Sequence, residues 1–347
     1  MTSPKNSSSS RSVRRVPLPR FFQKRFRHVI LHITERCNLQ CKSCFVRKST
    51  QELSLEDARL LAGKLGRPRW LDIGGGEPFL HPQLPEICSL FPDSDITIPT
   101  NGQDPEYIET TVSTIAQKHR KPLTIAVSLD GFEETNDCIR GSGSFARGLE
   151  SFQRLRALPG ITLKVNTVVC NANANSLLDF MAFIRAEEAD YHSLLLLRGQ
   201  PEDRSLALPP LEFLKENSSA ILKRLASYHY GSKRNPLLHS LKKRYQRYLW
   251  TVSLRTLEEE RCFVPCQAPW LHRVVYADGR LSMCELMPAS GNLLEESMET
   301  LEKEMEKALK NQEAKYGSCF CTHNCNMAEN IMTHPPSILS VILGIRP

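Results

Sequence analysis

Residues 28–44 read HVILHITERCNLQCKSC, an apolar β-type run that leads directly into three closely spaced cysteines. Thiolates are soft ligands that suit iron–sulfur clusters or zinc. Cys37, Cys41 and Cys44 can hold three irons of a [4Fe–4S] cluster and leave the fourth iron open, because no fourth cysteine lies in this loop. The alternative is a zinc knuckle that takes a fourth ligand from a distant part of the chain.

Outward from this loop, short runs rich in Val, Ile and Leu alternate with helical patterns. Such runs are typical of parallel strands that are buried on both faces. Strands are predicted at His28–Ile33, Trp70–Ile73, Asp95–Pro99, Leu123–Leu129, Thr162–Val169 and Tyr191–Leu197. Helices are predicted at Ser54–Leu65, where Ser54 and Asp57 form a capping pattern, and near Gln83–Leu90, Glu106–Lys118, Ser144–Leu158 and Ser176–Glu187. The alternation predicts an α/β fold with a parallel sheet or barrel.

Polar and glycine-rich motifs stand at the carboxyl ends of these strands, where α/β barrels assemble their active sites. One such motif alone predicts only a turn, but their recurrence after successive strands predicts a site. The motifs are Gly74-Gly75-Gly76-Glu77-Pro78, Thr100-Asn101-Gly102, Ser128-Leu129-Asp130-Gly131, Arg140-Gly141 in the following loop, Asn166 within the fifth strand, and Arg198-Gly199.

The order Cys-x3-Cys-x2-Cys, Gly-Gly-Glu-Pro, Thr-Asn-Gly, Ser-Leu-Asp-Gly and Arg-Gly resembles the radical S-adenosylmethionine (SAM) superfamily, particularly its SPASM and twitch subfamilies, over about residues 28–330. The resemblance implies a partial (β/α)6 TIM-like barrel followed by a small cysteine-rich domain. It also implies an enzyme whose open iron chelates SAM. One electron from a low-potential donor, of the flavodoxin or ferredoxin type, then yields methionine and a 5′-deoxyadenosyl radical that abstracts hydrogen from a substrate.

The resemblance also assigns residues. It makes Cys37, Cys41 and Cys44 the ligands of the SAM-binding cluster. SAM itself is expected to contact Gly75, Gly76, Glu77, Asn101, Ser128, Arg140 and Asn166. Glu77 would lie at the methionyl amino group, Ser128 at the ribose and Arg140 at the carboxylate. For Ser128 and Asp130, capping of the strand end is an alternative. One departure from the family is Ser43, where an aromatic residue usually stands beside the adenine.

Further cysteines recur around a predicted hairpin, Arg273–Met283, which turns at Asp278-Gly279. They are Cys262, Cys266, Cys284, Cys319, Cys321 and Cys325. Cys266, Gly279 and Cys284 fit the Cys-x9–15-Gly-x4-Cys element of the family's auxiliary-cluster domain. Two further clusters need about eight ligands, so the resemblance implies one auxiliary [4Fe–4S] cluster.

Two ligand sets are open for that cluster. Cys266 and Cys284 are joined by Cys262 and Cys325 if the SPASM pattern holds, or by two of Cys319, Cys321 and Cys325 if the twitch pattern holds. Zinc is an alternative to the cluster.

Glu285 directly follows Cys284. In some SPASM enzymes a carboxylate at the matching position takes the substrate proton, so the resemblance implies a catalytic general base. The alternative is a solvated surface glutamate. Cys88, Cys138 and Cys170 are predicted to be small core residues, and the histidines show no ligand spacing.

Charge is segregated along the chain, whose net charge is +7. Residues 1–34 carry eight Lys/Arg and residues 217–257 carry nine, in both cases without an acidic residue; 28 basic and 38 acidic residues remain elsewhere. The second segment includes Tyr228, Tyr230, Tyr245, Tyr248 and Trp250. It therefore predicts a helix whose basic face meets anionic lipid while its aromatic residues reach the interface, aided by the apolar tail Ile338–Leu343. The alternative is a solvated basic face; no nucleic-acid motif accompanies the charge.

The expected organisation is a basic, disordered segment (1–27), a radical SAM barrel (28–209), a basic helical linker (210–258), an auxiliary-cluster domain (259–330) and a tail (331–347). No apolar run is long enough to span a bilayer, and no secretory signal is present. We therefore expect a cytoplasmic protein that can lie peripherally on a membrane. A transit peptide within the first 34 residues is an alternative.

Three substrate classes are open: lipids or polyprenyl-linked compounds, sugars, and peptides. About 27 residues precede the first strand, too few for a packed leader-binding domain, which disfavours peptides. A rival function is a non-catalytic iron–sulfur electron-transfer protein or a zinc scaffold. Neither rival needs the Gly-Gly-Glu-Pro motif or Arg140.

Overall fold

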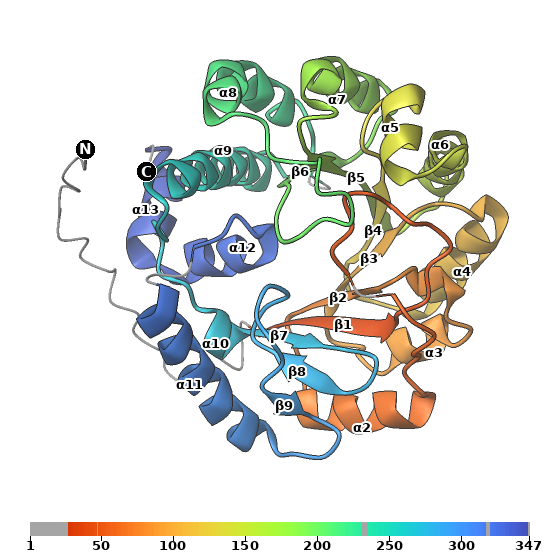
Figure 1. Cartoon of the computed structure of the whole chain (residues 1–347). Helices are drawn as coiled ribbons and strands as arrows, with labels where there is room; N and C mark the ends of the chain where they lie inside the picture. The colour runs from red at the N-terminus through yellow and green to blue at the C-terminus, as the bar shows by residue number, and fades with distance from the viewer. Residues whose placement is uncertain (1–26, 47, 231–234, 317–319, 346–347) are drawn as a thin grey trace.

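A computed structural model describes residues 27–46, 48–230, 235–316 and 320–345 (Figure 1). Six parallel strands lie side by side in the order β6-β5-β4-β3-β2-β1. Their bounds are β1 His28–Thr34, β2 Trp70–Gly75, β3 Asp95–Thr100, β4 Leu123–Ser128, β5 Ile161–Val169 and β6 Tyr191–Leu196. All six predicted strands are confirmed, each to within two residues at either end.

The helices between the strands form an outer layer around the sheet (Figure 1). They are α2 Leu55–Leu65, α3 Leu84–Ser89, α4 Pro105–Lys118, α5 Glu133–Arg140, α6 Ser144–Arg156 and α7 Leu177–Ala186, with short 3-10 turns η1 Pro78–Leu80 and η2 Ala174–Ser176. The predicted cap of α2 is confirmed, because the Ser54 hydroxyl accepts from the Asp57 N–H at 3.0 Å.

The placement of Arg140 in a loop was wrong, since it is the last residue of α5. Only Asn136 and Ile139 of this helix are buried. A short polar helix with one buried apolar residue has no apolar periodicity, so the sequence pattern could not reveal it.

The strands are buried between the helices and the barrel interior. All seven residues of β1 are buried, and Val29, Leu31 and Ile33 have no exposed surface. This is the burial expected of parallel strands with both faces covered. The first strand is therefore a rigid support for the cysteine loop that follows it.

The C-terminal part of the chain continues the same sheet. Strand β7 (His272–Val275) pairs with β1 in parallel, and β8 (Arg280–Ser282) and β9 (Gly291–Asn292) follow in antiparallel pairing. The predicted hairpin is confirmed, with Gly279 at φ +83°, a conformation that favours glycine.

One helix closes the gap between β6 and β1. In α12 (Asn324–Thr333), the Asn324 Nδ2 donates to the Leu194 carbonyl of β6 at 3.1 Å, and Glu329 Oε1 lies 2.7 Å from His28 Nδ1 of β1. The remaining helices lie outside it (Figure 1): α8 Leu211–Leu225, α9 Pro236–Glu259, α10 Ala268–Leu271, α11 Met298–Tyr316 and α13 Pro335–Leu343.

Most aromatic residues of the basic segment do not reach the surface. Tyr228 and Tyr230, in the loop after α8, and Tyr248 and Trp250, on α9, are all at most 5% exposed, while Tyr245 is half-buried. The expectation that they meet a lipid interface was therefore wrong. Within the described ranges, no helix combines the length and the apolar character that crossing a membrane requires.

Of the isolated cysteines, Cys88 and Cys170 are buried, as predicted. Cys138 is exposed on α5, so its assignment to the core was wrong.

Candidate active site

The three cysteines of the loop after β1 are half-buried, free thiols. The loop is fixed by one hydrogen bond within it and one to α5. The Cys44 N–H donates to the Cys41 carbonyl (3.0 Å), and the Lys42 N–H donates to the carbonyl of Ile139 in α5 (2.8 Å). Burial raises the pKa of the Cys37 and Cys41 thiols. A bound metal favours the thiolate, so this donor set fits an iron–sulfur cluster or zinc.

The glycines before Glu77 lie directly against the cysteine loop. The Gly76 N–H donates to the Thr34 carbonyl and the Glu77 N–H to the Arg36 carbonyl, both at 2.8 Å. A Cβ at Gly75 or Gly76 would collide with these same two carbonyl oxygens, and Gly75 has φ +116°. The glycines therefore let the loops after β1 and β2 meet backbone to backbone.

Glu77 is buried, with 3% of its surface exposed. Its Oε1 accepts from Thr100 Oγ1 (2.9 Å) and its Oε2 from the Asn101 N–H (2.7 Å). The Asn101 side chain in turn donates to Asn38 Oδ1 (2.7 Å) and lies 3.8 Å from Cys37 Sγ. Burial raises the pKa of Glu77 to about 7, against the effect of these hydrogen bonds. A buried carboxylate of this kind would pair strongly with a cationic ligand group.

Arg140 is oriented by Asp130. Its Nη1 donates to Asp130 Oδ2 at 2.8 Å, with side-chain exposures of 10% and 0%. The other Asp130 oxygen accepts from the Val168 N–H at 2.7 Å. Burial acts to lower the pKa of Arg140, but Asp130 and Cys41 outweigh it, so the pKa is raised and the guanidinium stays charged. A fixed planar cation thus lies beside the cysteine loop.

Two buried polar atoms near this edge lack a hydrogen-bond partner among the described residues: Asn166 Oδ1 and Arg140 Nε. Asn166 pairs in register with Ser128 across β4 and β5. Buried polar atoms are normally satisfied, so unpaired ones at one edge fit a polar ligand that would complete them. This is the edge at which the sequence placed the SAM contacts.

Glu285 lies in a buried ion-pair cluster, and the alternative of a solvated surface glutamate was wrong. Its side chain is 12% exposed. Its Oε2 is 2.9 Å from Arg198 Nη2 and 3.2 Å from His323 Nε2, and its Oε1 is 3.8 Å from His32 Nε2. Burial would raise the pKa of Glu285, but the three basic side chains hold it well below its usual value. The lowered pKa keeps Glu285 ionised and makes it a weaker base than a free glutamate, while its partners fix its position beside the cavity.

Neither histidine of this cluster was found from the sequence. His32 comes from β1 and His323 precedes α12, so they share no local spacing. The sequence signal that existed was the polar position of His32 within an otherwise apolar strand. A polar side chain inside a doubly buried strand must find a partner in the tertiary structure.

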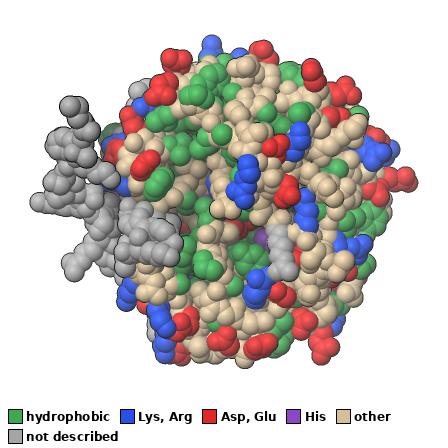
Figure 2. Space-filling model, in the orientation of Figure 1, with side chains coloured by type: hydrophobic (Ala, Val, Ile, Leu, Met, Phe, Trp, Pro, Cys, Tyr) green, Lys and Arg blue, Asp and Glu red, His purple; other side chains and the backbone are tan. Residues whose placement is uncertain are grey.

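A cavity of about 210 Å³ lies beside this cluster. Its lining includes His32, Phe45 of the cysteine loop, Tyr276 and Glu285. The face of the molecule in Figure 2 is hollowed at its centre, and a histidine side chain shows there. The cavity therefore joins the cysteine loop to the carboxylate through space that a small substrate group could enter.

The structure describes five of the six C-terminal cysteines that are candidate ligands. Cys284 is buried, and Cys262, Cys266, Cys321 and Cys325 are half-buried. Cys319 falls outside the described residues. The Cys325 Sγ lies 3.4 Å from Asp72 Oδ2, and burial raises its pKa well above the usual value.

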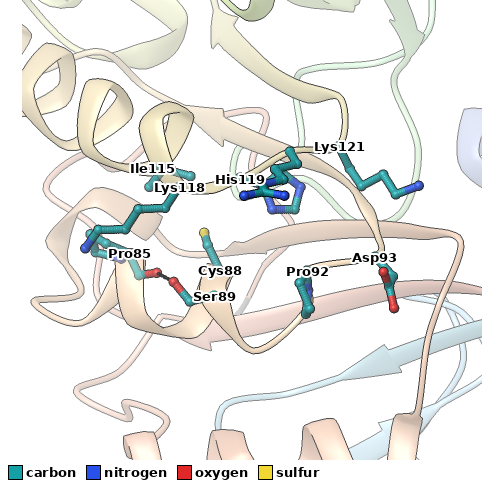
Figure 3. Close-up of a pocket in the computed structure, with 10 residues that line it drawn as sticks. Pro85, Cys88, Ser89, Pro92, Asp93, Ile115, Lys118, His119 and Lys121 are labelled. Atoms are coloured by element: carbon teal, nitrogen blue, oxygen red, sulfur yellow. Dashed lines mark hydrogen bonds between the residues drawn. The ribbon is translucent and has the colours of Figure 1, made fainter.

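Another cavity, of about 370 Å³, lies on the outer layer between α3 and α4 (Figure 3). Lys118, Arg120 and Lys121 give it a basic rim, and Cys88 lies at its wall. Within the described part of the chain, none of the candidate site residues is among those that line it. The residues that the sequence singled out lie elsewhere, at the carboxyl ends of the strands.

Comparison with known proteins matches residues 31–184 to the radical SAM superfamily. The chain is 34% identical over 186 residues to an S-adenosylmethionine-dependent nucleotide dehydratase of Fibrobacter sp. (strain UWH6), covering 45% of this chain and 52% of that protein. It is 29% identical over 160 residues to the mycofactocin maturase MftC of Mycobacterium ulcerans (strain Agy99), covering 43% and 42%. The chain thus spans about half the length of the curated relatives it matches.

Solved structures show the same fold over most of the chain. The structure of anSMEcpe with bound AdoMet matches with a TM-score of 0.58 at 15% identity, covering 92% of this chain and 100% of that one. Streptococcus suis SuiB bound to its precursor peptide SuiA matches with a TM-score of 0.58 at 15% identity, covering 78% and 63%. At this identity the likeness concerns the fold alone.

Proposed function

We propose that this chain is a radical SAM enzyme of the SPASM/twitch type, which cleaves SAM reductively and abstracts hydrogen from an organic substrate. The observation that carries the proposal is the convergence of the three-cysteine loop, buried Glu77 and half-buried Arg140 on one edge of the barrel. When bound at Cys37, Cys41 and Cys44, a [4Fe–4S] cluster supplies the electron that splits SAM into methionine and a 5′-deoxyadenosyl radical.

The residues around the loop would bind and orient SAM. Glu77 accepts from its ammonium group, and Arg140 donates to its carboxylate. Asp130 acts through Arg140 as a positioning residue, because it fixes the guanidinium at 2.8 Å. The unpaired Asn166 Oδ1 is available to a donor of the ligand, and Ser128 lies beside it in the sheet.

This assignment predicts the effect of removing the guanidinium. Arg140→Ala is expected to weaken SAM binding about ten- to hundredfold, since a charge-assisted hydrogen bond contributes about 1.5–3 kcal/mol. Asp130→Asn should weaken it less, because the cation remains but loses its orientation. Equilibrium dialysis of SAM under anaerobic conditions measures both, with Arg147→Ala, at an exposed position on α6, as the matched control. Equal SAM affinity in Arg140→Ala and Arg147→Ala would remove Arg140 from the site.

An auxiliary [4Fe–4S] cluster at the C-terminal cysteines is part of the proposal. Cys266 and Cys284 would hold it, together with Cys262 and Cys325 or with two of Cys319, Cys321 and Cys325. Zinc at the same thiolates is the alternative, and metal analysis of the anaerobically purified protein separates the two.

Glu285 is proposed as the group that takes the substrate proton. Its support is the ionised carboxylate held by Arg198 and His323 at the 210 Å³ cavity. The substrate classes are lipids or polyprenyl-linked compounds, sugars, and peptides, and the relative that is a nucleotide dehydratase adds nucleotides as a class. The electron would come from a low-potential donor of the flavodoxin or ferredoxin type.

Peripheral binding to an anionic membrane is also proposed, through the apolar tail that the sequence singled out and not through the aromatic residues of the basic segment. The exposed apolar residues lie on α13, where Leu339, Ile342 and Leu343 are 57%, 50% and 57% exposed. Helix α13 packs along basic α9, whose Arg244 donates to the Ile342 carbonyl. Apolar side chains flanked by basic ones are typical of an interfacial helix.

Co-sedimentation with vesicles tests this surface. The wild-type protein is expected to bind anionic vesicles, not neutral ones, and to be released as salt rises. Replacing Leu339, Ile342 and Leu343 together by Ser should remove the binding. Leu60→Ser is the control, because Leu60 is 47% exposed on α2, away from α13. Equal recovery of wild-type protein with anionic and neutral vesicles would contradict the membrane proposal.

A further inference from the structure

A cavity of about 770 Å³ lies at the amino-terminal ends of the strands, opposite to the cysteine loop. It is lined by the first residues of four strands: His28, Trp70, Asp95 and Tyr191. Helices α9 and α12 close it. Its volume is that of a site for a small organic molecule.

The walls of this cavity are largely apolar. They include Leu194, Leu196, Leu225, Leu249, Trp250 and Met332, from β6, α8, α9 and α12. Several of the charged residues that line it are paired with one another, while the carboxylate oxygens Asp95 Oδ1 and Glu329 Oε2 lack a partner among the described residues. His28 Nε2 lies 3.1 Å from Asp72 Oδ2, and Lys164 Nζ lies 5.4 Å from the centre of the Tyr191 ring. A ligand would therefore gain mainly from burying apolar surface.

This space is not the chamber of an iron–sulfur cluster. Of the candidate cluster ligands that the structure describes, Cys325 alone is among the lining residues. A cluster needs about four ligands around it. Neither group of cysteines encloses the cavity, and Cys325 is the one described candidate ligand that it touches.

The cavity opens beside exposed apolar surface. Leu238 of α9 lines it and is 42% exposed, and the preceding Leu237 is 71% exposed. Helix α13 lies along the same helix, because the Tyr248 hydroxyl donates to Ser337 Oγ at 3.0 Å and Arg244 donates to the Ile342 carbonyl. The apolar surface of α9 therefore reaches the cavity at Leu238; Lys242, one turn further along α9, also lines the cavity, and its Nζ donates to the Tyr230 carbonyl.

We propose that this cavity binds the long apolar chain of an amphiphile. The inference goes beyond the proposed function, because the cavity lies at the end of the barrel opposite to the cysteine loop. Its test is a binding measurement that does not depend on SAM cleavage.

The probe is cis-parinaric acid, a fluorescent long-chain fatty acid, titrated into the full-length holoprotein with oleate and octanoate as competitors. We expect saturable binding that oleate displaces and octanoate does not. Ala328→Phe fills the cavity from α12 and should weaken binding about tenfold or more, which corresponds to at least about 1.4 kcal/mol. Ala146→Phe makes the same change at an exposed position of α6 and should leave binding unchanged.

Ser193→Leu fills the cavity from the opposite wall, on β6, and guards against a folding defect in the first variant. Wild-type affinity in both cavity variants would overturn the proposal. The proposal would also be overturned if a Leu339→Ser, Leu343→Ser double variant lost the probe while the cavity variants still bound it. The acyl chain of the probe would then be adsorbed on the surface of α13. If the probe binds as expected but the protein cleaves no SAM, the proposed enzymatic function fails and the cavity site stands.

Discussion

Replacing Cys37, Cys41 and Cys44 together by Ala is expected to abolish SAM cleavage and to halve the iron content of the anaerobically reconstituted protein. Two [4Fe–4S] clusters correspond to about eight irons per chain, and the variant should keep about four. In the proposed site the three thiolates are the direct ligands, so we expect no neighbouring side chain to replace them. Iron and sulfide analysis, with chromatography of 5′-deoxyadenosine, measures both effects.

Cys138→Ala is the matched control for that experiment. Cys138 is an exposed cysteine on α5, and its Sγ lies 3.6 Å from Lys42 Nζ in the cysteine loop. The Cys138→Ala variant should keep the iron content and the SAM cleavage of the wild-type protein. Stoichiometric zinc without charge-transfer absorption in the wild-type protein would instead favour the zinc scaffold. Clusters without any SAM cleavage would favour the electron-transfer protein.

Glu329→Ala is expected to lower the free energy of unfolding by about 3–5 kcal/mol, the cost of breaking a buried ion pair by removing one partner. Glu329 Oε1 lies 2.7 Å from His28 Nδ1 and 3.0 Å from His272 Nδ1, and all three side chains are buried. Burial acts to lower the pKa of His28, but Asp72 and Glu329 raise it to about 10, so His28 is charged at neutral pH. In the variant, the charge of His28 is paired with Asp72 alone, and α12 loses the contacts that Glu329 makes with His28 of β1 and His272 of β7.

The control for this prediction is an ion pair at the surface. Glu258 pairs with Lys215 at 2.5 Å, with side-chain exposures of 49% and 41%. Glu258→Ala should change the free energy of unfolding by at most about 1 kcal/mol. Urea unfolding followed by circular dichroism compares the two variants. If they are equally stable, the buried network does not hold α12 in place.

Local sequence patterns were sufficient for the barrel. The six strands are continuous apolar runs, and the cap of α2 and the turn at Gly279 depend on residues a few positions apart. The cysteine loop and the Gly-Gly-Glu segment could be found in the same way. The short polar helix α5 could not, because its contacts with the rest of the chain bury only Asn136 and Ile139.

The sequence by itself determined the thiolate chemistry of the first loop and the edge of the barrel at which polar residues gather, because both depend on residue type and on position relative to a strand. Only the tertiary structure decided how Glu285 is held. Its partners His32, Arg198 and His323 come from β1, the loop after β6 and the start of α12. It also decided that most aromatic residues of the basic segment are buried, and that α12 closes the barrel over a 770 Å³ cavity. These features arise where segments far apart in the chain pack together. No single segment carries a periodic pattern that predicts which other segment it will contact.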